Sequence, residues 1–489
     1  MVTLDRAPEA APAGRAGREG WLDAALVSAP ATLAIALGLI DLTGRSLWLD
    51  EAATVAIAGQ HGSSLWSAIA HDGGNMLGYY ALMHVLIGWF GHGALAIRLA
   101  SVLAAGACAA GVSLLGLRLF DRRAAVAAGL LSAVSLPLVF WGQDARGYAL
   151  MVALVVWSFV ALAAVLDRPA RRGWWIAYVL FTGLSLYASF VAVFALLAQL
   201  VALGWRRDGW RRVISALGVC ALGWIPLLVL ALERGSGQLF WIPRPSLRTE
   251  GQVLQALSSA GFEPNFRPTF VSTALAIVTV GLLLAAAVRV LRALRFGPLL
   301  VLCWLAVPVV LMWLWSLVGQ PIFTPRNLLV SLPAVALLAG WVIMSMPGRL
   351  AWPALALLLA ARAVALVPSY GVSPENWRSA AAYVAGAQRP GDCLAFYPLD
   401  ARMPFAYYTG QPVTPYVERY DTPALPAGCS RVWLVASHEG QPDGPPVSRE
   451  HYGRFVALRS ELTREYGPPR TRSFGYASVI WVEVFGPRE

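Results

Sequence analysis

Long apolar segments alternate with short polar connections along this chain, and this pattern constrains the fold more than any other feature. Hydrophobic residues make up 58% of the 489 residues, whereas charged residues make up only 13%. About 20 apolar residues form a helix long enough to cross the hydrocarbon core of a bilayer. Eleven segments approach this length: 22–42, 95–117, 124–141, 148–166, 174–188, 190–205, 213–232, 270–288, 298–317, 327–346 and 350–368. The sequence therefore predicts an α-helical polytopic membrane protein with about eleven transmembrane helices.

The distribution of arginine predicts which ends of these helices face the cytoplasm. All 38 basic residues are arginines, and cytoplasmic loops of membrane proteins carry an excess of positive charge. When the first span runs outward, the predicted cytoplasmic segments contain 17 arginines, mostly in short loops. The external segments before the C-terminal region contain eight, spread over longer loops. We therefore expect a multi-pass protein of the plasma (inner) membrane with a cytoplasmic N-terminus and an external C-terminus.

One apolar segment, Met76–Phe90, is too short for an assignment from hydropathy alone. It has 15 residues and contains His84, so it can either span the membrane or lie at its surface. Treating it as a span would reverse every later loop and place the arginine-rich loops outside. The arginine distribution thus favours an interfacial or re-entrant helix in the first external loop.

The composition changes after about Pro368, where hydrophobic runs shorten and polar residues, glycine and proline return. We expect a disordered cytoplasmic tail at 1–21, a transmembrane catalytic module at 22–369 and an extracytoplasmic soluble domain at 370–489. In the last part, short runs typical of strands alternate with amphipathic runs typical of helices. A helix from Pro374, strands at Cys393–Tyr397, Val432–Val435 and Ala477–Phe485, and a helix at Ser448–Tyr466 predict a small α/β domain.

Cys393 and Cys429 each precede one of these predicted strands. If the two strands are parallel neighbours, the thiols start level with each other, and an oxidising exterior favours a disulfide. Two unrelated thiols are nearly as compatible with the sequence, because the sequence does not give the separation of the two Cα atoms.

The predicted topology brings five polar segments to the external side of the membrane. They are Asp50-Glu51 within SLWLDEAAT, the segment 61–75 with His71 and Asp72, the segment 141–148 with Asp144, Arg146 and Tyr148, the loop 233–268, and the segment 320–327 with Arg326. Each has an ordinary explanation alone, because a carboxylate after a span is often only solvated and an arginine beside a span extends toward water. Acids and arginines at membrane depth are costly, however, and their convergence indicates a functional site.

This set of residues suits the transfer of a sugar from a lipid phosphate. An acceptor hydroxyl needs a carboxylate at headgroup depth to take its proton. The departing phosphate needs cations, and the forked guanidinium of arginine suits this role. We expect Asp50 to be the base, Arg146 and Arg326 to bind the phosphate, and Trp48 and Leu49 to anchor Asp50 at that depth.

A divalent metal is a second interpretation of the same residues. Asp50, Glu51, His71 and Asp72 offer the oxygen and imidazole ligands that metals use. No fixed metal-ligand spacing is present in the sequence. The sequence therefore neither requires a metal nor identifies one.

Five motifs resemble those of bacterial family-39-like membrane glycosyltransferases of the GT-C fold, the superfamily of protein O-mannosyltransferases and the lipid A aminoarabinose transferase. They are WLDEAAT, NMLGYYALMH, AIRLASVL, GQDARGYAL and TPRNLLVSLP, which lie within residues 40–345. The resemblance implies a GT-C-like fold and an inverting transfer of a mannose- or arabinose-like sugar from polyprenyl phosphate. The acceptor would be a cell-envelope glycan, lipid or protein. The first-loop acid, here Asp50, would be the catalytic base.

From these arguments together we assign the candidate site residues. Asp50 and Glu51 are the catalytic candidates. The candidates for binding the phosphate or sugar of the donor are Arg146, Arg326, Tyr148, Asp72, His71, Asp144 and Tyr79.

Two other functions stay open at this point. A transporter or flippase would use the external acids as a proton or cation site, but we see few ionisable residues near the centres of the predicted spans and no obvious inverted repeat. A non-enzymatic scaffold would explain the domain at 370–489 but not the clustered acids and arginines. We expect membrane lipid, but no nucleic acid, among the partners.

Overall fold

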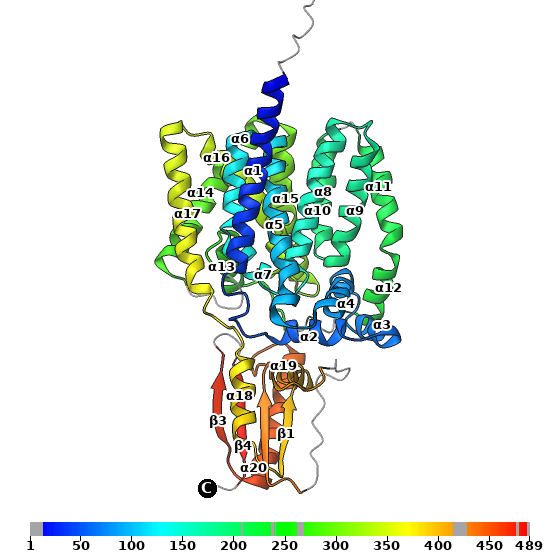
Figure 1. Cartoon of the computed structure of the whole chain (residues 1–489), viewed down its shortest axis with the longest axis vertical. Helices are drawn as coiled ribbons and strands as arrows, with labels where there is room; N and C mark the ends of the chain where they lie inside the picture. Colours follow the sequence, from blue (N-terminus) through cyan, green and yellow to red (C-terminus); the bar gives the residue numbers. More distant parts are fainter. Residues whose placement is uncertain are drawn as a thin grey trace, which may run out of the picture.

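A helical bundle carries a smaller α/β domain at one end (Figure 1). This computed structural model describes residues 13–206, 209–235, 239, 241–261, 268–413, 428–475 and 479–486. The first helix begins at Ala13, ahead of the predicted start of the first span. Residues 1–12 of the predicted tail and parts of the external loop 233–268 lie outside the described residues.

The bundle consists of helices that correspond to the predicted apolar segments. They are α1 (Ala13–Leu39), α5 (Ala94–Leu119), α6 (Arg122–Ala133), α7 (Leu136–Gly142), α8 (Tyr148–Asp167), α9 (Arg172–Ala188), α10 (Ala192–Trp205), α11 (Trp210–Gly223), α12 (Ile225–Arg234), α14 (Phe270–Ala293), α15 (Phe296–Val318), α16 (Leu332–Met344) and α17 (Gly348–Leu366), with the short 3-10 helices η2 (Asn327–Ser331) and η3 (Val367–Ser369). The chain is thus a multi-pass integral membrane protein.

Length and composition support fewer candidate spans than the eleven predicted. In the described part of the chain, seven helices are long and apolar enough to cross a membrane. Two bent pairs raise this number to nine: α6 and α7, at 55°, and α11 and α12, at 53°. The remaining two predicted segments form α9 and α10, which have 17 and 14 residues and are shorter than the roughly 20 residues that a full crossing needs.

Three short helices lie at the end of the bundle that is nearer the C-terminal domain: α2 (Leu49–Ala58), α3 (Gly62–His71) and α4 (Leu77–Phe90) (Figure 1). Helix α4 is the ambiguous apolar segment. Its 14 residues extend about 21 Å at 1.5 Å per residue, which is less than the roughly 30 Å of the hydrocarbon core. Its length therefore agrees with a helix that does not span.

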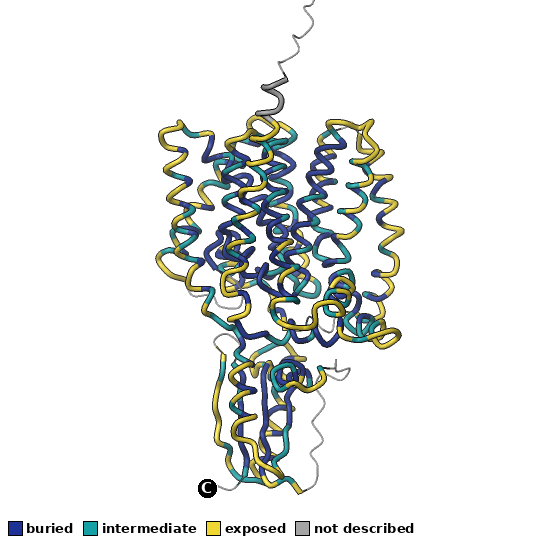
Figure 2. Tube along the Cα trace, in the orientation of Figure 1, coloured by how far each residue is buried: buried dark blue, intermediate teal, exposed yellow. Residues whose placement is uncertain are grey.

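Residues at the centre of the bundle are buried, whereas many residues of its outer helices are exposed (Figure 2). Helices α8 and α16 are almost wholly buried, and Phe159 of α8 stacks on Trp304 of α15. Ile277, Leu284 and Leu357 on α14 and α17 are more than 60% exposed. In the absence of lipid such exposure would be costly over a large patch, so these faces indicate contact with the bilayer.

The C-terminal domain is a four-stranded mixed sheet between helices. The strands are β1 (Asp392–Tyr397), β2 (Arg431–Ala436), β3 (Arg470–Phe474) and β4 (Ile480–Phe485), in the order β1-β2-β4-β3, with only β1 and β2 parallel. Helices α18 (Trp377–Ala387) and α20 (Pro446–Tyr466) pack against separate hydrophobic clusters of the sheet, and α19 (Arg402–Thr409) lies next to the bundle. The predicted α/β domain lacked β3, whose residues are mostly exposed and do not alternate in hydropathy.

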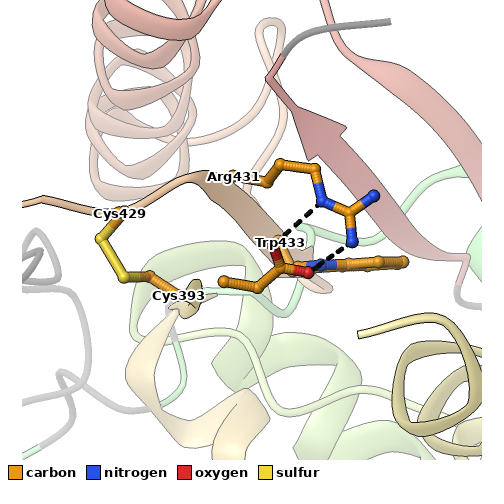
Figure 3. The surroundings of a disulfide bond; sticks show 5 residues. Cys393, Cys429, Arg431 and Trp433 are labelled. Carbon is orange, nitrogen blue, oxygen red and sulfur yellow. Dashed lines mark hydrogen bonds and ion pairs between the residues drawn. A yellow bond between two sulfur atoms is a disulfide. The ribbon is translucent and has the colours of Figure 1, made fainter. Parts of the chain in front are cut away.

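A disulfide joins Cys393 and Cys429 at the start of the parallel pair (Figure 3). Cys393 pairs in register with Val432, and Cys429 lies just before β2, so parallel pairing brings the two Cα atoms to 5.6 Å. Beside it, the Arg431 guanidinium donates two hydrogen bonds to Asp392, at 2.9 and 2.6 Å. These contacts hold β1 and β2 together at their N-terminal ends.

Replacing Cys393 with Ser is expected to destabilise the C-terminal domain by about 3–4 kcal/mol, because the cross-link joins cysteines 36 residues apart and restricts the unfolded chain. Pulse proteolysis of the full chain in urea measures this change. The matched control is Cys220→Ser, which removes a buried free thiol in the bundle. Equal urea midpoints for the domain in the wild type and in Cys393→Ser would contradict the prediction.

Candidate functional site

Asp50 lies in the first turn of α2 and faces two arginines from distant parts of the chain. Its Oδ2 is 3.9 Å from Arg146 Nε and 3.7 Å from Arg326 Nη1. The Asp50 side chain is 31% exposed, whereas the two arginines are 11% and 13% exposed. The structure therefore brings together the three residues to which the sequence assigned the proton transfer and the phosphate. It leaves the carboxylate accessible.

Three indole rings surround the guanidinium of Arg326. The distances from its Cζ to the ring centroids are 5.6 Å for Trp48, 5.6 Å for Trp141 and 4.7 Å for Trp241. Tyr148 packs against Trp141, with the ring centroids 4.8 Å apart. Cation–π contacts of this kind stabilise a charge that is largely removed from water. The cage thus fixes the position of a buried positive charge beside Asp50.

Arg146 is oriented by a second set of contacts, which ends at Asp72. Its Nη1 donates to the Tyr80 hydroxyl at 3.0 Å, and that hydroxyl donates to Asp72 Oδ2 at 3.0 Å. Within the described residues, the buried Nε of Arg146 has no hydrogen-bond partner. This N–H lies on the side of Asp50 and can donate a hydrogen bond to a further acceptor.

The neighbouring tyrosine, Tyr79, lies deeper than the sequence suggested. Its side chain is fully buried, and its hydroxyl lies 3.1 Å from Ser101 Oγ. Tyr80 rather than Tyr79 contacts Arg146, and sequence analysis missed it. The paired tyrosines at 79–80 were the available signal, but only the direction of α4 decides which ring faces the site.

Glu51 points away from Asp50 into the protein. It is fully buried, and Arg98 donates to its two oxygens from Nε at 2.7 Å and from Nη2 at 2.6 Å. The Ala145 N–H donates to the same carboxylate at 2.9 Å. Burial alone would raise the pKa of Glu51, but the charge and hydrogen bonds of Arg98 outweigh it and hold this pKa below its usual value. These contacts favour a positioning role, and the catalytic role assigned to Glu51 stays a prediction.

Arg98 also organises the segment that precedes Asp50. Its Nη1 donates to the carbonyl oxygens of Leu42 and Arg45, at 2.8 and 3.0 Å. One buried ion pair therefore joins α5, the first loop and the loop of Arg146. Sequence analysis treated Arg98 only as one of the external arginines, because its contacts reach back more than 45 residues.

Asp144 is the second buried carboxylate of the region. Its Oδ1 accepts a hydrogen bond of 2.7 Å from the Trp48 indole, so it anchors a wall of the Arg326 cage. Burial, followed by the negative charge of Glu51, raises the pKa of Asp144 to about 8. Asp144 is thus largely protonated at neutral pH, in contrast to Glu51.

Asp144→Asn is expected to remove part of the pH dependence of stability. The folded protein keeps the Asp144 proton up to about pH 8, whereas the unfolded chain releases it near pH 4, so stability falls as pH rises between these values. The melting temperature of the wild type should therefore drop from pH 6 to pH 9 more than that of Asp144→Asn. The control is Asp392→Asn, since the Arg431 hydrogen bonds hold the pKa of Asp392 at about 2. Equal slopes for all three proteins would contradict the prediction.

The metal interpretation finds no cluster in the part of the chain that the structure describes. No group of three or more His, Cys, Asp or Glu side chains there is arranged to hold a metal ion. His71 ends α3 next to Asp72, while Asp50 and Glu51 face different arginines. Asp50 thus faces Arg146 and Arg326, whereas Glu51 binds Arg98, and the two carboxylates do not converge on one point.

The C-terminal domain also reaches this site, which the sequence did not predict. Glu375, just before α18, accepts the Leu49 N–H at 2.9 Å, one residue before Asp50. His438, from the loop after β2, lies 3.2 Å from the other oxygen of Glu375. No local pattern marks these residues, because the contact exists only when the domain packs on the bundle.

Comparison with known proteins gives one family match, and it covers part of this site but neither Asp50 nor Arg326. Residues 76–232 match the family described as dolichyl-phosphate-mannose-protein mannosyltransferase. This range includes Tyr80, Asp144, Arg146 and Tyr148. No curated protein matches the chain in sequence.

Solved structures with the same fold cover nearly the whole chain. ArnT from Cupriavidus metallidurans, solved bound to undecaprenyl phosphate, has a TM-score of 0.58 and 15% identity over 95% of this chain and 98% of its own. The oligosaccharyltransferase AglB from Archaeoglobus fulgidus, solved with an inhibitory peptide and a dolichol-phosphate, has a TM-score of 0.56 and 11% identity over 93% of this chain and 73% of its own. At such identities the likeness establishes the fold, including the placement of the C-terminal domain after the bundle.

Proposed function

We propose that the chain is a membrane glycosyltransferase of the GT-C type that transfers a sugar from a polyprenyl phosphate to an extracytoplasmic acceptor, with Asp50 as general base. The observation that carries this proposal is the contact of one accessible carboxylate with two largely buried arginines. A base and cations for a leaving phosphate are the two requirements of this reaction. The ligands named for the solved structures, undecaprenyl phosphate and dolichol-phosphate, are lipid phosphates of the same class as the leaving group proposed here.

The reaction proceeds as a single displacement at the anomeric carbon of the donor. The acceptor hydroxyl oxygen forms a bond to this carbon while the bond from carbon to phosphate oxygen breaks. The electron pair of the broken bond stays on the phosphate, which leaves as polyprenyl phosphate, and Asp50 takes the hydroxyl proton. Arg146 and Arg326 stabilise the charge that develops on the leaving group, and the anomeric configuration inverts.

The site faces the extracytoplasmic side of the plasma (inner) membrane. The loops that follow α5, α8, α10, α14 and α16 lie at the opposite end of the bundle (Figure 1). These loops and the helix ends that adjoin them contain most of the arginines that the sequence places in the cytoplasm. The disulfide lies in the domain on the side of the site, where an oxidising compartment would keep it formed.

The sugar is mannose- or arabinose-like, and the acceptor is a glycan, lipid or protein of the cell envelope. The family match to residues 76–232 supports a lipid-linked pyranose or related donor. To test the function, purified protein is incubated with labelled polyprenyl-phosphate sugars, one donor at a time, and with an envelope extract. Label should pass from one donor to a product in the extract. Absence of transfer from every donor, with the protein folded, would contradict the proposal.

Arg326→Gln is expected to weaken donor use about 10- to 100-fold, because a charge-assisted hydrogen bond contributes about 1.5–3 kcal/mol. The loss should appear in kcat/KM for the lipid-phosphate donor. Arg326→Lys should recover only part of the activity, since lysine cannot reproduce the planar contact with three indoles. Arg212→Gln, an exposed position in α11, is the matched control. Unchanged kcat/KM in Arg326→Gln would exclude a phosphate-binding role.

A further inference from the structure

Helix α2, which carries Asp50, lacks a cap of its own. The residue at its N-cap position is Trp48, whose side chain makes no capping hydrogen bond. The first N–H groups of a helix have no partner within the helix and need an acceptor from elsewhere. Several other helices use a local residue for this purpose, such as Asp121 for α6 and Asn376 for α18.

The C-terminal domain supplies the missing acceptor. Glu375 Oε2 accepts the Leu49 N–H at 2.9 Å, and the same oxygen accepts the Trp377 indole N–H at 2.7 Å. The Glu375 side chain is 1% exposed, so its position is fixed by packing. A carboxylate at this place also interacts favourably with the positive end of the helix.

Further contacts tie the segment before Asp50 to the same domain. The Ser46 N–H donates to Ser373 Oγ at 3.0 Å, and the Leu47 N–H donates to the Tyr408 hydroxyl at 2.7 Å. The guanidinium of Arg378 donates to the carbonyl oxygens of Thr43 and Gly44, each at 2.9 Å. We call the residues Ser373, Glu375, Arg378 and Tyr408 the domain clamp. The clamp contacts residues 43–49, and α2 begins directly after them.

His438 lies outside the domain clamp but contacts Glu375 of the clamp, and its backbone conformation is strained. Its φ is 57°, in the left-handed region that few side chains adopt without support. Its Nε2 lies 3.2 Å from Glu375 Oε1, and its Nδ1 lies 2.6 Å from Ser437 Oγ. Two ring nitrogens with such neighbours suit an imidazolium that donates from both.

The charges around His438 favour this form. The His438 side chain is 38% exposed. Partial loss of water around the ring would lower the pKa of His438, but Glu375, then Asp50 of α2 and Glu439 of its own loop, raise it above its usual value. His438 therefore carries a positive charge at a higher pH than an ordinary histidine. This charge is lost as pH rises through its folded pKa.

We propose that the C-terminal domain is part of the catalytic machinery, because Glu375, held by His438, caps α2 and positions Asp50. Glu375 and His438 are positioning residues, since they act on the reaction through the helix that carries the base. The inference rests on the function proposed above. The soluble domain is then necessary for the chemical step and not only for binding the acceptor.

The test compares Glu375→Gln and His438→Asn in the full-length protein with Glu483→Gln. Glu483 is a matched control because it is also a buried carboxylate of the C-terminal domain, but its partners are Arg459 and Thr471. Asparagine is used at 438 because it tolerates the left-handed backbone. Rates are measured per folded molecule, as kcat and donor KM for sugar transfer from pH 5 to pH 9.

We expect Glu375→Gln to lower kcat about tenfold, the size of one lost charge-assisted contact, with the donor KM within about twofold. The kcat of the wild type should fall at alkaline pH as His438 loses its proton. The kcat of His438→Asn should be lower than that of the wild type at neutral pH and should not show this alkaline fall. Wild-type kcat and pH profile in both variants would overturn the inference. So would a lower melting temperature with unchanged kcat per folded molecule, which indicates a structural role only.

A parallel assay of Asp50→Asn separates this inference from the proposed function. If Asp50→Asn is inactive while Glu375→Gln has full kcat, only the positioning role fails. If Asp50→Asn retains full activity, Asp50 is not the base and positioning it has no effect on the reaction. If the folded wild type transfers sugar from none of the donors, the proposed function itself fails.

Discussion

Asp50→Asn is expected to reduce sugar transfer by about 10²–10⁴-fold, the usual contribution of a general base. The change preserves the size of the side chain but removes the proton acceptor that faces Arg146 and Arg326. Because the phosphate-binding arginines are retained, donor KM should change little while kcat falls. Steady-state transfer with the identified donor measures both constants.

The matched control for this variant is Asp23→Asn. Asp23 pairs with Arg122 on the surface of the bundle, with a side chain 44% exposed, and contributes little to stability. Its substitution should leave transfer unchanged. An active Asp50→Asn protein would remove Asp50 as the base, whatever the donor.

Arg98→Met is expected to destabilise the protein by about 3–5 kcal/mol, because it leaves the buried Glu51 carboxylate without its cation. Both side chains are fully buried and their closest contact is 2.6 Å. The first loop should also lose order, since Arg98 holds the carbonyl oxygens of Leu42 and Arg45. The amount of folded protein in detergent on heating measures the effect.

A double-mutant cycle separates the ion pair from general packing. Glu51→Gln combined with Arg98→Met removes both charges, so the double variant should be more stable than the sum of the single effects allows. Additive losses would show that the two charges do not depend on each other. Arg118→Met, at the other end of α5 where the guanidinium lies over the Trp174 ring, serves as the matched control.

The sequence predicted the bundle well because its signal is local. Runs of apolar residues and the arginines between them depend on the bilayer and not on distant partners. Fewer than eleven helices qualify as spans by length and composition in the described part of the chain, because hydropathy alone does not reveal that α9 and α10 have 17 and 14 residues. The strand β3 was missed for a similar reason, since an exposed edge strand has no alternating pattern.

The candidate site was predicted in part. Asp50, Arg146 and Arg326 were identified because acids and arginines at membrane depth are rare and few positions carry them. The sequence assigned the base to Asp50 but did not show that Glu51 turns away from the site, because the two side chains leave α2 in different directions. The direction of Glu51 depends on Arg98, which lies 47 residues away.

The residues that sequence analysis missed act across larger separations. Tyr80 orients Arg146 from 66 residues away, and Glu375 caps α2 from 326 residues away. Neither pairing has a local motif. Both become visible only when the packing of α4 on the bundle, and of the C-terminal domain on α2, is known.

The central claim is tested most directly by the stoichiometry of one reaction. Wild-type protein in lipid vesicles is given a labelled polyprenyl-phosphate sugar and acceptor, and the transferred sugar and the released polyprenyl phosphate are quantified together. If Asp50 is the base, the wild type should give equal amounts of transferred sugar and released polyprenyl phosphate. Asp50→Asn should give neither product. Donor that crosses the membrane intact, with no polyprenyl phosphate released, would contradict the account and indicate a flippase.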